Sequence, residues 1–231
     1  MVAILIILTI VGFVVADALV QRARGRKVIV RTQAESQPTG RNASRFVFED
    51  LALPQGVFLG AGHTWLSLNP AGEARVGMDD FTQRVMGSIN GVELPRIGEQ
   101  VRRGQKLFAI YQGKRTAEFT APLDGVIINV NQMLQQNPEP LKSDPFEEGW
   151  ICSLSPTNLA KDIKQLVVAD DAREWLNREI QRFLAFVVAR PSEYFALGHV
   201  LQDGGEPANG LLEMMDDETW GLFIQKFLKT V

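Results

Sequence analysis

Short runs of β-forming residues, separated by turns rich in glycine, proline and asparagine, fill the middle of this chain from Val57 to Leu154. Strands this short, at such regular intervals, are typical of a small all-β domain. The clearest runs are Thr64–Leu68, Lys106–Tyr111 and Val126–Val130. One helical turn is expected to interrupt them at Asp79–Met86, where Asp79 can cap the first turn. The sequence thus predicts a β-rich domain over residues 57–156.

The pattern becomes helical after this domain. Across Asp170–Ala189, apolar residues recur at the spacing of an amphipathic helix, and Arg190-Pro191 ends the pattern. A second helix is expected over about Leu211–Lys229. Residues 157–231 are therefore predicted to form a helical extension.

The beginning of the chain is its most apolar part, with 17 hydrophobic residues among the first 20. As a helix, the 19 residues from Val2 to Val20 would be about 28 Å long, close to the hydrocarbon thickness of a bilayer. We therefore expect residues 1–21 to be a transmembrane anchor. A cleaved signal peptide is the alternative, because Ala16-Asp17-Ala18 has small residues at the spacing of a cleavage site.

Several residues of this segment and its flank are candidates for membrane and partner contacts. Gly12 and Ala16 form a small-residue pair that would let another helix approach, and Asp17 could pair with a partner protein. The basic residues that follow the apolar run are Arg22, Arg24, Arg26 and Lys27. By the positive-inside rule, they predict a single pass through the inner (cytoplasmic) membrane, with the N-terminus outside. Residues 22–56 are then a basic juxtamembrane segment and linker, and the later domains are cytoplasmic.

Composition excludes several classes of function. Residues 21–50 hold seven Lys/Arg against three Asp/Glu, whereas residues 51–231 hold 17 against 23, a balance that argues against nucleic-acid binding. One cysteine, Cys152, cannot form an internal disulfide, and with two histidines it is too few for a Cys/His zinc site. The sequence also lacks a phosphate-binding loop and a nucleophile elbow. We therefore do not expect an enzyme.

Five groups of motif residues follow one another in the β-rich region. They are His63-Thr64-Trp65; Val76-Gly77-Met78-Asp79-Asp80-Phe81; Val92-Glu93-Leu94-Pro95 with Gly98, Val101 and Gly104; Ala121-Pro122-Leu123-Asp124-Gly125-Val126 with Val130-Asn131; and Asn137-Pro138 with Asp144-Pro145-Phe146 and Gly149-Trp150. In this order they resemble the motifs of the glycine cleavage system H protein family, lipoyl carriers with a flattened β-barrel, or hammerhead, fold. The expected fold class is then α+β: a single N-terminal transmembrane helix, an H-protein-like barrel over 57–156 and a C-terminal helical extension.

The same resemblance singles out Lys114. It stands eight residues before Pro122, the spacing of the family's lipoylated lysine before its Ala-Pro motif, and Gly113 would place it at a hairpin tip. The resemblance thus implies Lys114 as a lipoyl attachment site. The family typically reads Glu-Ser-Val-Lys-Ala here, whereas this chain reads Tyr111-Gln112-Gly113-Lys114-Arg115. It also implies His63 as a contact of the lipoyl arm; the alternative for His63 is a structural residue.

Two functions remain open. In the first, the chain is a non-catalytic subunit or scaffold without a cofactor, which contacts the bilayer and other subunits of a membrane complex, photosynthetic or respiratory. In the second, it is a membrane-tethered lipoyl carrier with lipoate on Lys114, which shuttles an aminomethyl group or redox equivalents between glycine-cleavage-type enzymes. The departures around Lys114 and the expected anchor favour the first.

Overall fold

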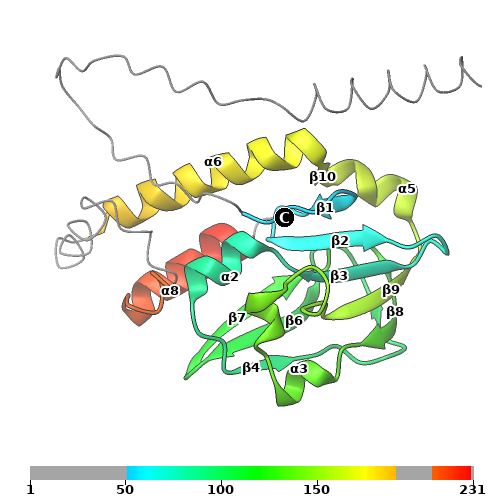
Figure 1. Ribbon diagram of the computed structural model, residues 1–231, viewed down its shortest axis with the longest axis horizontal. Helices are drawn as coiled ribbons and strands as arrows, with labels where there is room; N and C mark the ends of the chain where they lie inside the picture. The colour runs from blue at the N-terminus through cyan, green and yellow to red at the C-terminus, as the bar shows by residue number, and fades with distance from the viewer. Residues whose placement is uncertain (1–50, 191–209, 230–231) are drawn as a thin grey trace, which may run out of the picture. The chain divides into compact units, whose positions relative to one another are not determined.

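The computed structural model describes residues 51–190 and 210–229, which contain two antiparallel sheets (Figure 1). The seven-stranded sheet has the order β10-β1-β2-β3-β9-β8-β5, and the three-stranded sheet has the order β4-β6-β7. The first sheet comprises β1 (Val57–Leu59), β2 (Thr64–Leu68), β3 (Ala74–Met78), β5 (Gln100–Val101), β8 (Gly125–Val130), β9 (Cys152–Pro156) and β10 (Val167–Val168). The second comprises β4 (Gly91–Glu93), β6 (Lys106–Gln112) and β7 (Arg115–Thr120).

Helices connect and cover the sheets. Short helices lie in the loops: α2 (Asp80–Met86), α3 (Met133–Gln136), α4 (Pro140–Ser143), α5 (Leu159–Asp162) and the 3-10 turn η1 (Ile163–Gln165). The extension contains α6 (Ala169–Val188), then α8 (Asp217–Phe223) continued by η3 (Ile224–Leu228), a π-helical turn. Figure 1 shows α6 running beside β1.

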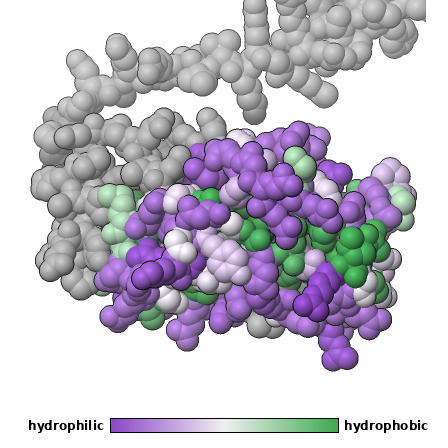
Figure 2. Space-filling model, turned by 90° about the horizontal axis from the view of Figure 1, so that it is seen from below, coloured by the Kyte–Doolittle hydropathy of each residue, from purple (hydrophilic) through white to green (hydrophobic). Residues whose placement is uncertain are grey.

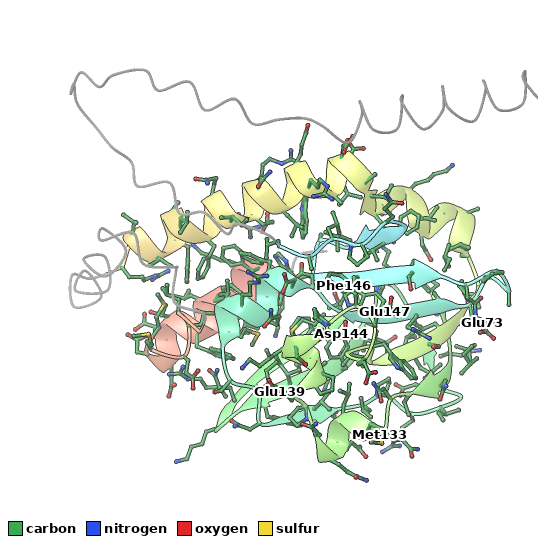
Figure 3. All side chains as sticks on the ribbon, viewed as in Figure 1. Glu73, Met133, Glu139, Asp144, Phe146 and Glu147 are labelled. Carbon is green, nitrogen blue, oxygen red and sulfur yellow. The ribbon has the colours of Figure 1, made fainter. Side chains whose placement is uncertain are left out.

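A tryptophan sits where β2 and β3 pair. Trp65 is fully buried and lies opposite Gly77 on the neighbouring strand. Its Nε1 donates to the carbonyl oxygen of Pro145 at 3.0 Å, and its ring centroid lies 5.7 Å from that of Phe146. Figure 3 labels Phe146 beside Asp144 and Glu147. Gly77 is required for this packing, because a Cβ there would lie 2.6 Å from Trp65 Nε1.

An aromatic cluster joins the helical extension to the β-rich domain. Phe183 of α6 contacts Phe81 of α2 and Phe223 of α8, each with ring centroids 5.9 Å apart and nearly perpendicular rings. Phe227 of η3 stacks on Phe223 at 4.8 Å. All four rings are at most 1% exposed. Because these contacts join α2 to α6, the extension shares the core of the domain rather than forming a separate one. Burying one phenylalanine contributes about 1.5–3 kcal/mol to stability.

The surface is mainly hydrophilic on the face shown in Figure 2, with local groups of hydrophobic residues. Within residues 51–190 and 210–229, four large apolar side chains are more than half exposed: Ile97, Met133, Val188 and Met214. Exposed apolar residues that occur singly are normal for a folded protein.

Several expected elements are confirmed. Helix α2 begins where predicted, and Asp79 Oδ1 accepts from the backbone N–H of Thr82 at 2.9 Å, as an N-cap should. The predicted helix over 170–189 is α6, shifted by one residue. The last helix begins six residues later than predicted, at Asp217, because Asp216 is extended and caps it: Asp216 Oδ1 accepts from the backbone N–H of Thr219 at 2.7 Å.

The membrane part of the predicted fold is corrected. Within residues 51–190 and 210–229, no helix has the length and apolar character needed to cross a bilayer. A fold class with a single transmembrane helix is therefore wrong for the part of the chain that the structure describes, and the inner-membrane location that depended on it is withdrawn. The expected anchor, residues 1–21, and the first 29 residues of the expected linker, residues 22–50, lie outside the described residues.

The contact between Trp65 and Gly77 gives a stability prediction. We expect Gly77→Ala to lower the free energy of unfolding by about 1–3 kcal/mol, because the added methyl group overlaps the indole ring. Denaturant unfolding measures this change. The control is Gly221→Ala in α8, where a Cβ meets nothing within 4 Å; it should be neutral or stabilise the protein by up to about 1 kcal/mol. Equal midpoints for both variants would contradict the predicted overlap.

Candidate functional site

Lys114 lies at the tip of the β6–β7 hairpin. Gln112 and Arg115 pair across the strands, which leaves Gly113 and Lys114 as a two-residue turn. Gly113 has φ +58°, the left-handed conformation that tight hairpin turns need and that glycine adopts without strain. The Lys114 side chain is exposed and forms no hydrogen bond or ion pair with any other described residue. The hairpin thus presents an amine to solvent.

The turn is fastened on one side to the connection between α2 and β4. Gln112 is buried, and its Nε2 donates to the carbonyl oxygens of Met86 at 2.6 Å and Ser88 at 2.9 Å. The backbone N–H of Gly113 donates to Asn90 Oδ1 at 2.7 Å. The two residues before Lys114 are therefore held in place.

Arg115 fastens the turn on its other side to the C-terminal segment. Its Nη1 and Nη2 donate to the carbonyl oxygens of Leu212 at 3.1 Å and Met215 at 2.6 Å, and its Nε donates to Asp217 Oδ1 at 2.7 Å. The guanidinium also lies 5.4 Å from the ring centroid of Trp220. Only 20% of the Arg115 side chain is exposed, so these contacts are largely shielded from water.

The C-terminal segment in turn contacts the α2–β4 connection. Glu213 accepts from the Oγ of Ser88 at 2.6 Å and from its backbone N–H at 3.1 Å; these hydrogen bonds lower the pKa of Glu213. Gly87 and Gly210 pack together so closely that a Cβ on Gly87 would lie 2.6 Å from the Cα of Gly210. We call the meeting of residues 84–90, 112–115 and 210–220 the Lys114 junction. Each of its three parts forms hydrogen bonds with the other two.

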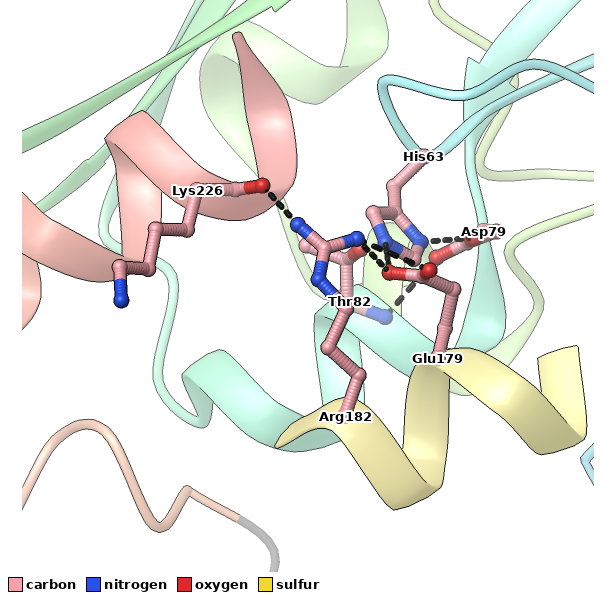
Figure 4. Close-up of polar contacts among 6 residues, drawn as sticks. All are labelled: His63, Asp79, Thr82, Glu179, Arg182 and Lys226. Atoms are coloured by element: carbon pink, nitrogen blue, oxygen red, sulfur yellow. Dashed lines mark hydrogen bonds and ion pairs between the residues drawn. The ribbon is translucent and has the colours of Figure 1, made fainter. Parts of the chain in front are cut away.

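His63 is the centre of a second, buried polar cluster (Figure 4). It precedes β2 with φ +58°, so it lies outside the strand that carries Trp65. Its side chain is completely buried, with Nδ1 2.7 Å from Asp79 Oδ2 and Nε2 3.5 Å from Glu179 Oε2. The first contact is a hydrogen bond. The second is too long for a good one but short enough for charge attraction.

The charges around His63 favour its protonated form. Complete burial by itself would lower its pKa, but the charge of Asp79, its hydrogen bond and the nearby Glu179 outweigh burial and raise the pKa to about 9. Burial also acts to raise the pKa of Glu179, but its contacts with the positive charges of His63 and Arg182 hold the pKa below its usual value. Arg182 binds both Glu179 oxygens and donates to the carbonyl oxygen of Lys226.

Two functional candidates from the sequence are described, and they lie in different places. Lys114 is at the junction, exposed, whereas His63 is buried under α6 and η3, where its ring lies 5.0 Å from that of Trp175 and 6.5 Å from that of Phe227. Contact of His63 with a lipoyl arm stays a prediction. The expected membrane and partner contacts lie outside the described residues: Gly12, Ala16, Asp17, Arg22, Arg24, Arg26 and Lys27.

The sequence analysis missed the residues that hold Lys114 in place. It treated Arg115 only as a departure from the family motif, and it assigned nothing to Asn90 or Glu213. The partners of Arg115 lie about 100 residues further along the chain, so no local pattern reveals them.

Other reactive groups do not form a site in the described ranges. Cys152 is buried in β9, and burial raises the pKa of its thiol to about 12. Residues 51–190 and 210–229 contain no group of three His, Cys, Asp or Glu side chains placed to hold a metal ion.

A small antiparallel β domain with a lysine presented on a tight hairpin defines a lipoyl-domain-like protein. Comparison with known proteins specifies the family: a model described as glycine cleavage H-protein matches residues 59–179, slightly more than half of the chain. The chain belongs to the glycine cleavage H-protein family, as its motifs indicated.

Two relatives of similar sequence support this assignment. A probable glycine cleavage system H protein of Thermococcus kodakarensis is 37% identical over 122 residues, which are 53% of this chain and 90% of the relative. The glycine cleavage system H protein of Listeria monocytogenes is 33% identical over 127 residues, 55% of this chain and all of the relative. A crystal structure of such a protein from Mycobacterium marinum is 26% identical, with a TM-score of 0.46 over 55% of this chain and 98% of that one.

The His63 cluster gives a prediction about pH. Because the pKa of His63 rises from 6.5 in the unfolded chain to about 9 in the folded one, its contribution is complete below pH 6.5 and is lost as the pH rises through about 9. We expect the free energy of unfolding to fall by about 3 kcal/mol across this window. Urea unfolding at several pH values measures it.

For the variant Glu179→Gln, the free energy of unfolding should fall less steeply over the same pH window. The substitution removes one of the two carboxylates that favour the imidazolium. Stability that stays constant or rises between pH 6.5 and 9 in the unaltered protein would show that His63 is neutral in the folded state.

Proposed function

We propose that this chain is a lipoyl carrier protein, with lipoate joined to Lys114 Nζ through an amide bond. It passes an aminomethyl group or redox equivalents between the enzymes of a glycine-cleavage-type system. The observation that carries the proposal is the exposed Lys114 at a two-residue turn whose neighbours on both sides are held by hydrogen bonds. Membership of the H-protein family supports it.

The residues around Lys114 fit an attached lipoyl group. Acylation needs an amine that an attaching enzyme can reach, and Lys114 is exposed and has no acidic partner among the described residues. The change from an ammonium to a neutral amide therefore breaks no ion pair in the described structure. A Cβ on Gly113 would meet nothing within 4 Å, so the tip is also open around the backbone.

The protein's own part in this function is to hold and present the attachment point. Lipoate, when bound, supplies a disulfide that can be reduced and a thiol that can carry an aminomethyl group. Gln112, Gly113 and Arg115 fix the backbone on either side of Lys114, so the motion of the arm begins at the lysine side chain. The chain acts as a carrier and not as the catalyst.

This proposal reverses the order of the two hypotheses. A scaffold without a cofactor, bound to the bilayer and to membrane subunits, gains no support from the fold or from the relatives. The family instead favours lipoate as cofactor and glycine-cleavage-type enzymes as partners.

The proposal predicts that Lys114 is the lysine modified. Incubated with a lipoate–protein ligase, ATP and lipoate, the unaltered protein should gain one lipoyl group in its intact mass. Lys114→Arg should gain none, since arginine cannot form the amide. The matched control is Lys161→Arg, which alters an exposed lysine of α5 and should be modified like the unaltered protein. Modification of Lys114→Arg, or none of the unaltered protein, would refute the assignment.

A further inference from the structure

The C-terminal segment 210–220 lies against the lysine-bearing hairpin at its tip. Three of its groups bind one side chain, Arg115, which directly follows Lys114: the carbonyl oxygens of Leu212 and Met215 and the carboxylate of Asp217. Only 20% of the Arg115 side chain is exposed in this contact, although Arg115 flanks an exposed turn. Such a contact fixes the conformation of the tip and of the segment together.

The segment is also held independently of Arg115. The backbone N–H groups of Gly210 and Leu212 donate to the carbonyl oxygens of Arg84 and Val85 at 2.7 and 3.0 Å. Glu213 accepts two hydrogen bonds from Ser88. Loss of Arg115 would therefore release the segment from the hairpin without detaching it from the domain.

We infer that the C-terminal segment 210–220 is part of the modification site, and that Arg115 is a positioning residue for Lys114. A modifying enzyme that reaches Lys114 meets the hairpin tip and this segment as one surface. The inference rests on the proposed function, because it concerns how Lys114 is recognised.

Arg115 is suited to this role in a way that lysine is not. Its planar guanidinium donates in three directions at fixed angles, to Asp217 and to two carbonyl oxygens, and its face lies over Trp220. Of the three contacts, the one with Asp217 contributes least, because the Asp217 side chain is 88% exposed and water competes for its carboxylate. The two shielded carbonyl oxygens should therefore account for most of the positioning.

The test compares three full-length variants with the unaltered protein: Arg115→Ala, Asp217→Asn and Arg102→Ala. Arg102→Ala is the matched control, because this exposed arginine has no side-chain partner given by the described structure and lies in the β5–β6 turn. One measurement is hydrogen exchange of the amides in 210–220. The other is the rate of lipoylation by a lipoate–protein ligase with ATP and lipoate, over a range of protein concentrations.

For Arg115→Ala, we expect amide exchange in 210–220 to rise by about tenfold or more, because hydrogen bonds from a charged donor are lost. We expect kcat/KM for lipoylation to fall by about fivefold or more, mainly through a higher KM, since a loosened surface is recognised less well. For Asp217→Asn, both the exchange rate and kcat/KM should stay within about twofold of those of the unaltered protein, because the two hydrogen bonds to carbonyl oxygens remain. Arg102→Ala should match the unaltered protein in both measurements.

Distinct outcomes would overturn the inference. Faster exchange in Arg115→Ala with an unchanged lipoylation rate would leave Arg115 with a purely structural role. Unchanged exchange would show that Arg115 does not hold the segment. An equal loss of lipoylation rate in Arg102→Ala and Arg115→Ala would show that the loss comes from the missing positive charge alone. If the unaltered protein is not lipoylated at all, the proposed function fails, and this inference fails with it.

Discussion

One guanidinium joins parts of this protein that lie about 100 residues apart in the sequence. Arg115 leaves the hairpin next to Lys114 and binds two carbonyl oxygens and a carboxylate of the C-terminal segment. Both carbonyl oxygens lie before α8, which begins at Asp217, and that of Leu212 also accepts from the backbone N–H of Met215 at 3.2 Å. Arg115 thus adds hydrogen bonds from a charged donor to the backbone of the C-terminal segment, and these tie the segment to the turn that presents Lys114.

A second connection joins the extension to the domain further inside. His63 bridges Asp79, at the start of α2, and Glu179 of α6, and Arg182 continues the contact to η3. Two carboxylates with an imidazolium and a guanidinium balance in charge, which lets the group be buried among aromatic rings. Two residues of the H-protein-like motifs, His63 and Asp79, thereby help attach the helical extension to the lipoyl-domain-like core.

The sequence predicted those parts of the fold that depend on local patterns. The α2 cap at Asp79 and the α6 helix follow from neighbouring residues, so both were correctly expected. It missed the turns that precede the Asp216 cap of α8, because Gly210 and Leu212 there donate to the distant end of α2. In the sequence alone, Arg115 was only a departure from the family motif, because its partners are likewise remote in sequence. The position of Lys114 was predictable because two residues, Gly113 and Lys114, suffice to make the turn.

The most direct test of the central claim is the mass of the natural protein. The chain should be isolated from its own cells, its intact mass measured and its peptides mapped across the β6–β7 hairpin. This account predicts a lipoyl group on Lys114 in at least part of the population. An unmodified Lys114 in cells whose other lipoyl proteins carry the group would contradict it, and would leave the hairpin as a structural feature inherited from the family.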